Sequence, residues 1–317
     1  MTDESELDDV ICRLKSNDSR LTTLHLDDYS SRNDGVLQFR EYLPGSLPTR
    51  VYLHRSQLSA RAAPLAESLA CNSTLSRLVL RGADLRAEGV SLISQALPTN
   101  SALASLTLAW NGMTAAEAAQ IAGALAGNST LTELNLADNR LAPEGVARFA
   151  HLLASNSTLS TLVLSGNNLR GLGLARLVGA LSTNSTLTCL HLGRGGLGSE
   201  EAPLIADLLA SSASLSTLIL CDNYLGLDGV SVIERAVISI PSITDIQLNY
   251  FNSSLHAHIL RNKHNRHQKS ASLFFLLSCF LNSLEKGKSG KQIPAISAAR
   301  HSRSPVYFSL QSEQFYF

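Results

Sequence analysis

Leucines recur at a fixed spacing through the middle of the chain. From residue 131 the sequence reads LTELNLADNRL, with apolar residues at its first, fourth, sixth and eleventh positions and an asparagine at the ninth. The pattern restarts every 28 residues, and the first apolar residues of successive units are Leu75, Leu103, Leu131, Leu159, Leu187, Leu215 and Ile243. Side chains alternate between the two faces of a strand, so the L-x-L core of each unit predicts a short strand with leucines on its buried face.

The second half of each unit carries signals for a helix. Thr114 and Glu117 have the T-x-x-E spacing of a capping box, which satisfies free backbone N–H groups at a helix start. Pro143 suits the first position of another helix, where a missing N–H costs nothing. Phe149 and Leu153 share one helical face through their i, i+4 spacing. We therefore expect each unit to be a strand followed by a helix that packs on the strand layer.

Asparagines mark both turns of each unit. The ninth position of the pattern, where the strand ends, is held by Asn111, Asn139, Asn167 and Asn223. A side-chain amide at this point can bond to backbone groups that the turn would otherwise leave without partners. An Asn-Ser pair closes each helix at Asn72, Asn100, Asn128, Asn156 and Asn184. We expect these asparagines to adopt the left-handed conformation of a helix C-terminal cap, which asparagine tolerates.

The repeating pattern resembles the leucine-rich repeat, whose units span about 20 to 29 residues. A strand plus a full helix in 28 residues is similar to the ribonuclease-inhibitor-like class, which includes the repeat domains of NOD-like receptors and the GTPase-activating protein of Ran. The resemblance covers residues 21–252, including a degenerate unit in which Val51 and Leu53 follow a spacing of 27. It implies an α/β leucine-rich-repeat solenoid of about nine strand–helix units, a horseshoe with parallel strands on its concave face.

The two ends of the chain differ from the repeats. Within residues 1–20 we expect a disordered acidic lead over residues 1–9 and then a short helix that caps the first repeat. The solenoid is predicted over residues 21–254, and residues 255–317 form a basic tail. The apolar segment of that tail, Leu273–Leu284, is shorter than the ~20 residues of a membrane-spanning helix. A helix that caps the last repeat, an interfacial membrane anchor and a disordered tail all stay open as interpretations.

Charge and cysteine usage exclude several classes of protein. The chain has 26 Lys and Arg against 26 Asp and Glu, and a net charge of zero argues against a nucleic-acid binder that works through bulk charge. Its five cysteines are scattered without zinc-ligand spacing, so we expect free thiols of a reducing compartment. The acidic start is unlike a secretory signal peptide. We therefore predict a cytoplasmic protein, with export by a route without such a signal left open.

No motif in the sequence supports catalysis or cofactor binding. Residues 193–198 match G-x-G-x-x-G, but they fall at the turn of a repeat rather than in a nucleotide-binding βαβ unit. Residues 287–289 read Gly-Lys-Ser but lack the earlier glycine of a phosphate-binding loop. The tail histidines have no metal-ligand spacing and stand among Lys and Arg residues: His256, His258, His264 and His267. We therefore expect no enzyme, no cofactor and no metal.

The concave face remains as the candidate site. Its outward strand positions in the early units bring together the residues Arg50, Tyr52, His54, Arg55, Arg77, Arg81 and Trp110. Arg, Tyr and Trp are enriched at protein-binding hot spots, and a cluster of arginines favours an acidic partner. Solvation of the surface by exposed charges is the competing interpretation.

These observations favour a non-catalytic scaffold or adaptor that binds a protein partner on the concave face of the repeat arc. No nucleic acid is expected, and membrane contact through the tail is not favoured. Two alternatives stay open. One is a GTPase-activating or regulatory protein for a small GTPase, which the resemblance to the Ran-directed relative implies. The other is a host-directed effector that uses the repeats for target recognition.

Overall fold

The computed structural model describes residues 3–18, 23–27, 49–54 and 58–248, together with Ile259 and Asn262. The chain divides into two compact units, Met1–Arg266 and His267–Phe317. The second unit lies outside the described residues, and so does the apolar segment for which three interpretations were left open. Across the described part of the chain, every helix is too short or too polar to span a membrane.

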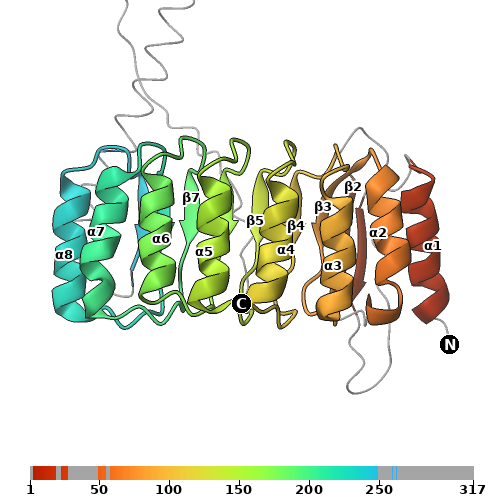
Figure 1. The fold of residues 1–317 in the computed structure, drawn as a ribbon, viewed down its shortest axis with the longest axis horizontal. Coiled ribbons are helices and arrows are strands. Elements are labelled where there is room, and N and C mark those ends of the chain that lie inside the picture. The colour runs from red at the N-terminus through yellow and green to blue at the C-terminus, as the bar shows by residue number, and fades with distance from the viewer. Residues whose placement is uncertain are drawn as a thin grey trace, which may run out of the picture. The chain divides into compact units, whose positions relative to one another are not determined.

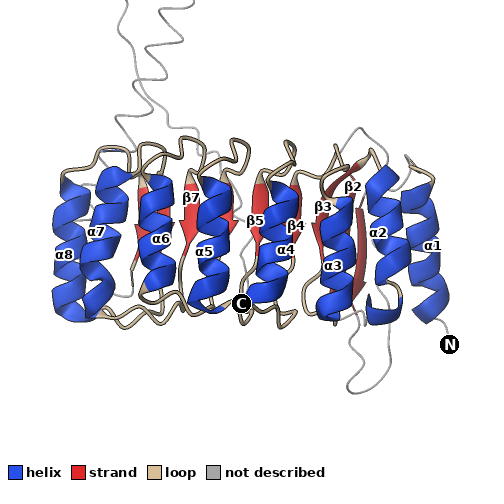
Figure 2. Cartoon of the chain, in the orientation of Figure 1, coloured by secondary structure: helices blue, strands red, loops and turns tan. Residues whose placement is uncertain are grey.

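A single parallel sheet runs the length of the first unit (Figure 2). Its strands lie in chain order, each paired with the next: β1 (Thr23–Asp27), β2 (Thr49–His54), β3 (Leu75–Val79), β4 (Ser105–Thr107), β5 (Glu133–Asn135), β6 (Thr161–Val163), β7 (Cys189–His191), β8 (Thr217–Ile219) and β9 (Asp245–Gln247). Between β3 and β9 each residue pairs with the one 28 positions later, as in Arg77 with Ser105. The predicted strands, their parallel order and the 28-residue register are confirmed.

Helices form one layer in front of the sheet (Figure 1). They are α1 (Asp3–Lys15), α2 (Ala62–Cys71), α3 (Arg86–Ala96), α4 (Ala115–Leu125), α5 (Ala142–Leu153), α6 (Leu172–Leu181), α7 (Ala202–Ser211) and α8 (Gly226–Ile238), with short 3₁₀ turns at Leu58–Ala60 and Ser199–Glu201. Each of these helices packs beside the next one along the chain. This repeated strand and helix is an α/β solenoid, as the sequence predicted.

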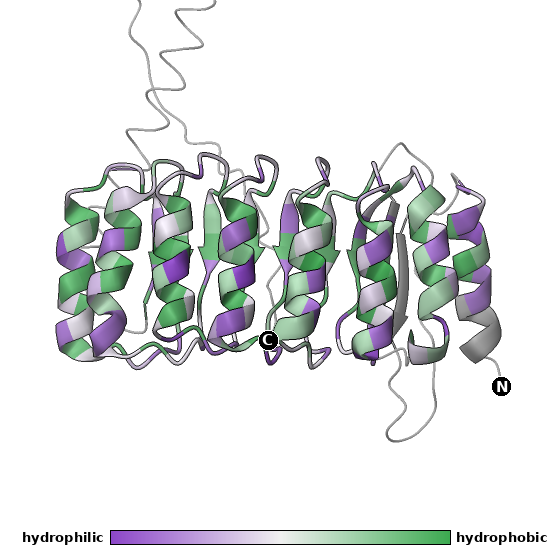
Figure 3. Ribbon diagram, viewed as in Figure 1, coloured by the Kyte–Doolittle hydropathy of each residue, from purple (hydrophilic) through white to green (hydrophobic). Residues whose placement is uncertain are grey.

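The core lies between the sheet and the helices. One row of it is a ladder of strand residues in register, all buried: Leu78, Leu106, Leu134, Leu162, Leu190, Leu218 and Ile246. Phe149 and Leu153 of α5 meet this layer from the helical side and are also buried, which confirms the predicted helical face. Figure 3 shows the resulting pattern, with apolar and polar residues alternating around each helix. Glycine lets these helices approach closely, because a Cβ on Gly145 would lie 3.1 Å from the Ala115 Cα.

Buried asparagines hold the turns that lead from each helix into the next strand. The Asn100 amide donates to the Leu69 carbonyl at 2.7 Å, and its oxygen accepts from the backbone N–H of Ala102 at 3.1 Å and of Leu103 at 2.7 Å. Similar bonds are made by the equivalent residues of the next three units, Asn128, Asn156 and Asn184. The predicted left-handed conformation is wrong, since Asn72 is extended at φ −77° and the later members have negative φ as well. An extended backbone aims the amide into the preceding unit.

Pieces at both ends cover the repeat stack. Helix α1 begins at Asp3, so the acidic residues expected in a disordered lead are helical from that point. Its Val10, Ile11 and Leu14 are buried beside α2, as expected of a cap. At the other end Ile259 is buried, and the Asn262 amide donates to the Ile243 carbonyl at 2.9 Å. That bond extends the pattern of backbone-binding asparagines beyond the last strand.

Candidate protein-interaction site

The strand residues that alternate with the buried leucines lie on the sheet face away from the helices, here called the open face. Register places Arg50 beside Arg77, and Tyr52 beside Val79. Of the predicted group, the register thus places Arg50 and Arg77 on neighbouring strands. Arg55 lies outside the described residues, so its predicted place in the group remains a prediction.

One arginine of the group is already paired with a carboxylate. The Arg77 guanidinium lies 2.8 Å from the Glu133 carboxylate, across the small side chain of Ser105 on the strand between them. Sequence reasoning missed Glu133, although it stands 56 residues after Arg77 and therefore at the same position two units later. The pair offsets the positive charge of Arg77 on the open face.

Two aromatic contacts organise the rest of the group. The rings of Tyr52 and His54 are stacked with their centroids 6.3 Å apart. The Arg81 guanidinium lies 5.7 Å from the centroid of the Trp110 ring, within the range of a cation–π interaction. Trp110 is nevertheless 52% exposed. A large aromatic side chain is thus held in place by a cation while much of its surface stays open to a partner.

The backbone of Trp110 is strained. Its φ is +62°, in the left-handed region that bulky residues avoid. The same position in the neighbouring units also has positive φ, and there it holds Gly82, Asp138, Gly166, Arg194 and Asp222. Strain of this kind costs roughly 1–3 kcal/mol and persists where the surrounding structure enforces it. A tryptophan at this turn is therefore costly for the fold, which singles Trp110 out within the group.

Farther along the open face, Cys189 and His191 form a half-buried pair with the thiol sulfur 3.2 Å from Nε2. Burial raises the pKa of the Cys189 thiol to about 11, and the Asp245 and Glu133 carboxylates add to that rise. Burial lowers the pKa of His191, while Asp245 acts in the opposite direction. At neutral pH the favoured species are a thiol and a neutral imidazole. The pair is therefore poorly suited to act as a thiolate nucleophile.

The glycine motif at residues 193–198 is explained by the packing of neighbouring repeat units. Gly195 stands where other units have asparagine, and its N–H donates to the Asn223 amide oxygen at 2.9 Å. A side chain at Gly195 would collide with Leu169 of the preceding unit. These contacts account for the glycine without a nucleotide. Within the described part of the chain, no three His, Cys, Asp or Glu side chains are grouped as metal ligands.

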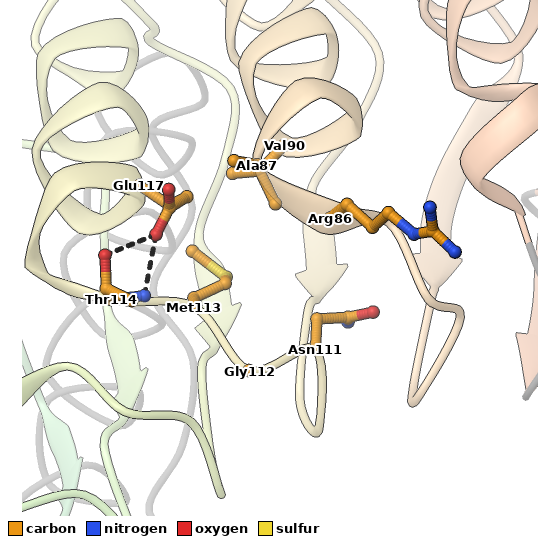
Figure 4. A pocket seen from close by; sticks show the side chains of 8 residues that line it. All are labelled: Arg86, Ala87, Val90, Asn111, Gly112, Met113, Thr114 and Glu117. Atoms are coloured by element: carbon orange, nitrogen blue, oxygen red, sulfur yellow. Dashed lines mark hydrogen bonds between the residues drawn. The ribbon is translucent and has the colours of Figure 1, made fainter.

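A shallow pocket of about 160 Å³ lies between the start of α3 and the turn before α4 (Figure 4). The Glu117 carboxylate in its wall accepts hydrogen bonds from the Thr114 backbone N–H at 2.7 Å and hydroxyl at 2.6 Å. The hydroxyl contact lowers the pKa of Glu117, and together these bonds complete the predicted capping box. The Asn111 amide donates to the Leu80 carbonyl at 2.7 Å. Glu117, Thr114 and Asn111 are thus used by the helix cap and the turn, and the Arg86 guanidinium lies 3.3 Å from the Asp84 carboxylate.

Comparisons with known proteins agree with the repeat pattern. The family described as Leucine Rich repeat matches residues 127–150 and 155–178. Two units thus match the family directly, and the parallel strands in chain order make the described part of the first unit a leucine-rich-repeat solenoid in fold. Its 28-residue units, each with a strand and most with a full helix, have the arrangement that the ribonuclease-inhibitor-like class implies.

Solved structures similar to this chain include two at low identity. The leucine-rich repeat-containing protein LegL7 from Legionella pneumophila is 17% identical, with 76% of this chain and 96% of that chain covered and a TM-score of 0.44. Actin-binding site 2 of leiomodin-1 is 13% identical, with 85% of this chain and 96% of that chain covered and a TM-score of 0.27. No curated protein matches the chain.

Proposed function

We propose that this protein is a non-catalytic scaffold or adaptor that binds an acidic protein partner on the open face of its N-terminal repeats. Leucine-rich-repeat domains generally mediate protein–protein interaction, and their stacked strands offer an extended binding surface. The observation that carries the proposal is Trp110, which is exposed, strained in its backbone and covered on one side by Arg81.

Charge supports an acidic partner at this site. Arg50 and Arg77 are neighbours in the sheet, and Arg81 lies in the turn that follows β3. Only Glu133 opposes them among the ion pairs described for these three arginines. A carboxylate of a partner would gain from Arg81 a charge-assisted contact, and an apolar group next to it would cover the exposed Trp110 ring.

Proximity labelling in cells tests this proposal. The intact chain is compared with a variant in which Arg50, Arg77 and Arg81 are changed to glutamate, and with Trp110→Ala. The matched control reverses two exposed arginines of the helical layer, Arg148 and Arg176. Circular dichroism establishes that all variants are folded.

The expected result is that a set of specific partners disappears in both open-face variants and persists in the helical control. Partners that persist in every variant would overturn the proposed site. Partners lost equally in the helical control would show that binding follows overall charge, which would also overturn it.

A further inference from the structure

The pocket between α3 and α4 lies where one unit departs from the repeat. Fourteen residues after the first leucine of a unit, in the first turns of its helix, the chain usually has a glycine: Gly89, Gly145, Gly173 and Gly229. A Cβ on any of these glycines would come within 3.3 Å of the preceding unit. The unit of Leu103 has Glu117 at this position instead, and a space remains between its helix and α3.

The unit of Leu187 also has a carboxylate at this position, but that carboxylate is buried. Glu201 is 5% exposed, and its Oε2 accepts a hydrogen bond from the Gly198 N–H at 2.6 Å. Glu117 is half-buried and forms part of the wall of the pocket. Of the two glutamates, Glu117 is therefore the one that a group from outside can reach.

The pocket combines an apolar floor with one negatively charged oxygen (Figure 4). Val90 and Met113 of its lining are buried, and Ala87 adds a methyl group. Both hydrogen bonds from Thr114 end on Oε2 of Glu117, and among the described residues no other residue donates to Oε1. The bond from the Thr114 hydroxyl lowers the pKa of Glu117, so the carboxylate is ionised at neutral pH.

The charges around the pocket favour a cation. Arg86 is the other charged residue of the lining, and its guanidinium is directed away from Glu117 and toward Asp84, 3.3 Å from that carboxylate. The exposed charged residues at the starts of α3 and α5 are otherwise mostly acidic: Asp84, Glu88 and Glu144 against Arg140. A positively charged group would therefore be attracted to the pocket, and an anion would be repelled.

The volume and the chemistry of the pocket together indicate its occupant. A space of about 160 Å³ is well below the roughly 300 Å³ of the smallest usual ligand pockets, so it fits one side chain rather than a cofactor. Lysine has an apolar stem that can cover apolar surface and a single charged end. Arginine fits less well, because its fork binds both oxygens of a carboxylate and Oε2 of Glu117 is already used.

We propose that this pocket binds a lysine side chain of a protein partner. The stem of the lysine lies on Val90 and Met113, and its ammonium donates to Oε1 of Glu117. The inference goes beyond the proposed function and does not rest on it. The pocket lies between two helices and takes a positive group, whereas the arginines of the open face favour an acidic one.

Methyl NMR of the full chain tests this assignment. The sequence has two methionines, so a chain labelled at the methionine methyl carbons gives at most one signal besides that of Met113. The probe is Nα-acetyl-lysine methylamide, and the matched ligand is its norleucine counterpart, which keeps the apolar stem and lacks the ammonium. The lysine probe is expected to shift the Met113 signal saturably. The norleucine ligand should bind about tenfold more weakly, since it lacks a charge-assisted hydrogen bond.

Two variants separate the carboxylate from the rest of the surface. Glu117→Gln removes the charge and keeps the helix cap, because glutamine also serves at this position of a capping box. It is expected to lose about tenfold in affinity for the lysine probe and to bind the norleucine ligand as before. Glu144→Gln, in the first turn of α5, is the matched control and should keep the affinity of the wild-type chain. Circular dichroism establishes that both variants are folded.

Several outcomes would overturn this inference. The Met113 signal does not move saturably with the lysine probe, the norleucine ligand binds as tightly as lysine, or Glu117→Gln binds lysine as tightly as the wild-type chain. An equal loss of affinity in Glu144→Gln would show that the probe follows the general negative charge of this surface, which also overturns it. Equal binding of the corresponding arginine derivative would overturn the assignment to lysine.

Discussion

The two edges of the solenoid differ in how much their turn residues vary from unit to unit. Where helices lead into strands, the same buried asparagine returns in unit after unit with nearly the same hydrogen bonds, at Asn100, Asn128, Asn156 and Asn184. Where strands lead into helices, an asparagine ladder also occurs, but beside it one left-handed position holds a glycine, a tryptophan, an aspartate or an arginine. Uniform positions hold neighbouring units together, and positions that vary between units are those available for recognition.

The largest loss of stability should come from removing one of the asparagines that recur at the turns where strands lead into helices. Asn167 is buried, and its amide donates to the Leu136 and Leu164 carbonyls at 3.0 Å each. Asn167→Ala leaves buried backbone groups without partners, so we expect a loss of about 1–3 kcal/mol in the free energy of unfolding. Asn168→Ala at the exposed neighbouring position is the control and should change it by less than about 0.5 kcal/mol. Equal losses in urea denaturation would show that the ladder is not what distinguishes these positions.

At Trp110 we expect a smaller change in the free energy of unfolding, and here substitution by glycine relieves strain instead of adding a cost. Glycine adopts φ of +62° without the steric cost that any side chain brings, whereas alanine keeps that cost. Trp110→Gly should therefore be more stable than Trp110→Ala by about 1 kcal/mol. Ala119→Gly, inside α4, is the control and should be destabilising by about 0.5–1 kcal/mol. If Trp110→Ala were the more stable of the two, the backbone at this turn would not be strained.

The smallest effect concerns pH on the open face. The pKa of His191 is lowered in the folded protein by burial, so the unfolded chain takes up a proton more readily. Stability from this residue is therefore intact above the ordinary histidine pKa of about 6.5 and decreases as pH falls below it. His191→Gln should reduce the slope of unfolding free energy between about pH 7 and pH 5. An unchanged slope in His191→Gln would contradict this expectation.

The repeat made most of the fold predictable from sequence. A 28-residue step with leucines at fixed positions determines which residues pair in the sheet from β3 onward, and the 27-residue spacing of the degenerate unit makes Arg50 and Arg77 neighbours. The capping box at Thr114 and the buried face of α5 follow from spacing within one unit. These features depend on the spacing of residues along the chain, which can be read from the sequence.

Features that depend on contacts between units were harder to predict. The backbone of Asn100 was expected to be left-handed, but its φ is negative, and its amide reaches the Leu69 carbonyl, 31 residues earlier. Glu133 was overlooked because its partner Arg77 stands two units away. The strain at Trp110 cannot be read from a pattern that contains the residue type but not its φ. The arrangement of side chains on the open face therefore depends on these longer-range contacts.

The ion pairs that span two units also bear on how such a chain can change length. Asparagine bonds join nearest neighbours, so a 28-residue unit could be lost or duplicated and the ladder would close again with equivalent partners. Arg77 with Glu133, and Arg194 with Asp138 at 3.0 Å, each pass over one small residue, Ser105 or Gly166. Changing the unit between them would separate or crowd the charges. The buried asparagine bonds would therefore form again in any order of units, whereas the surface ion pairs require the present order.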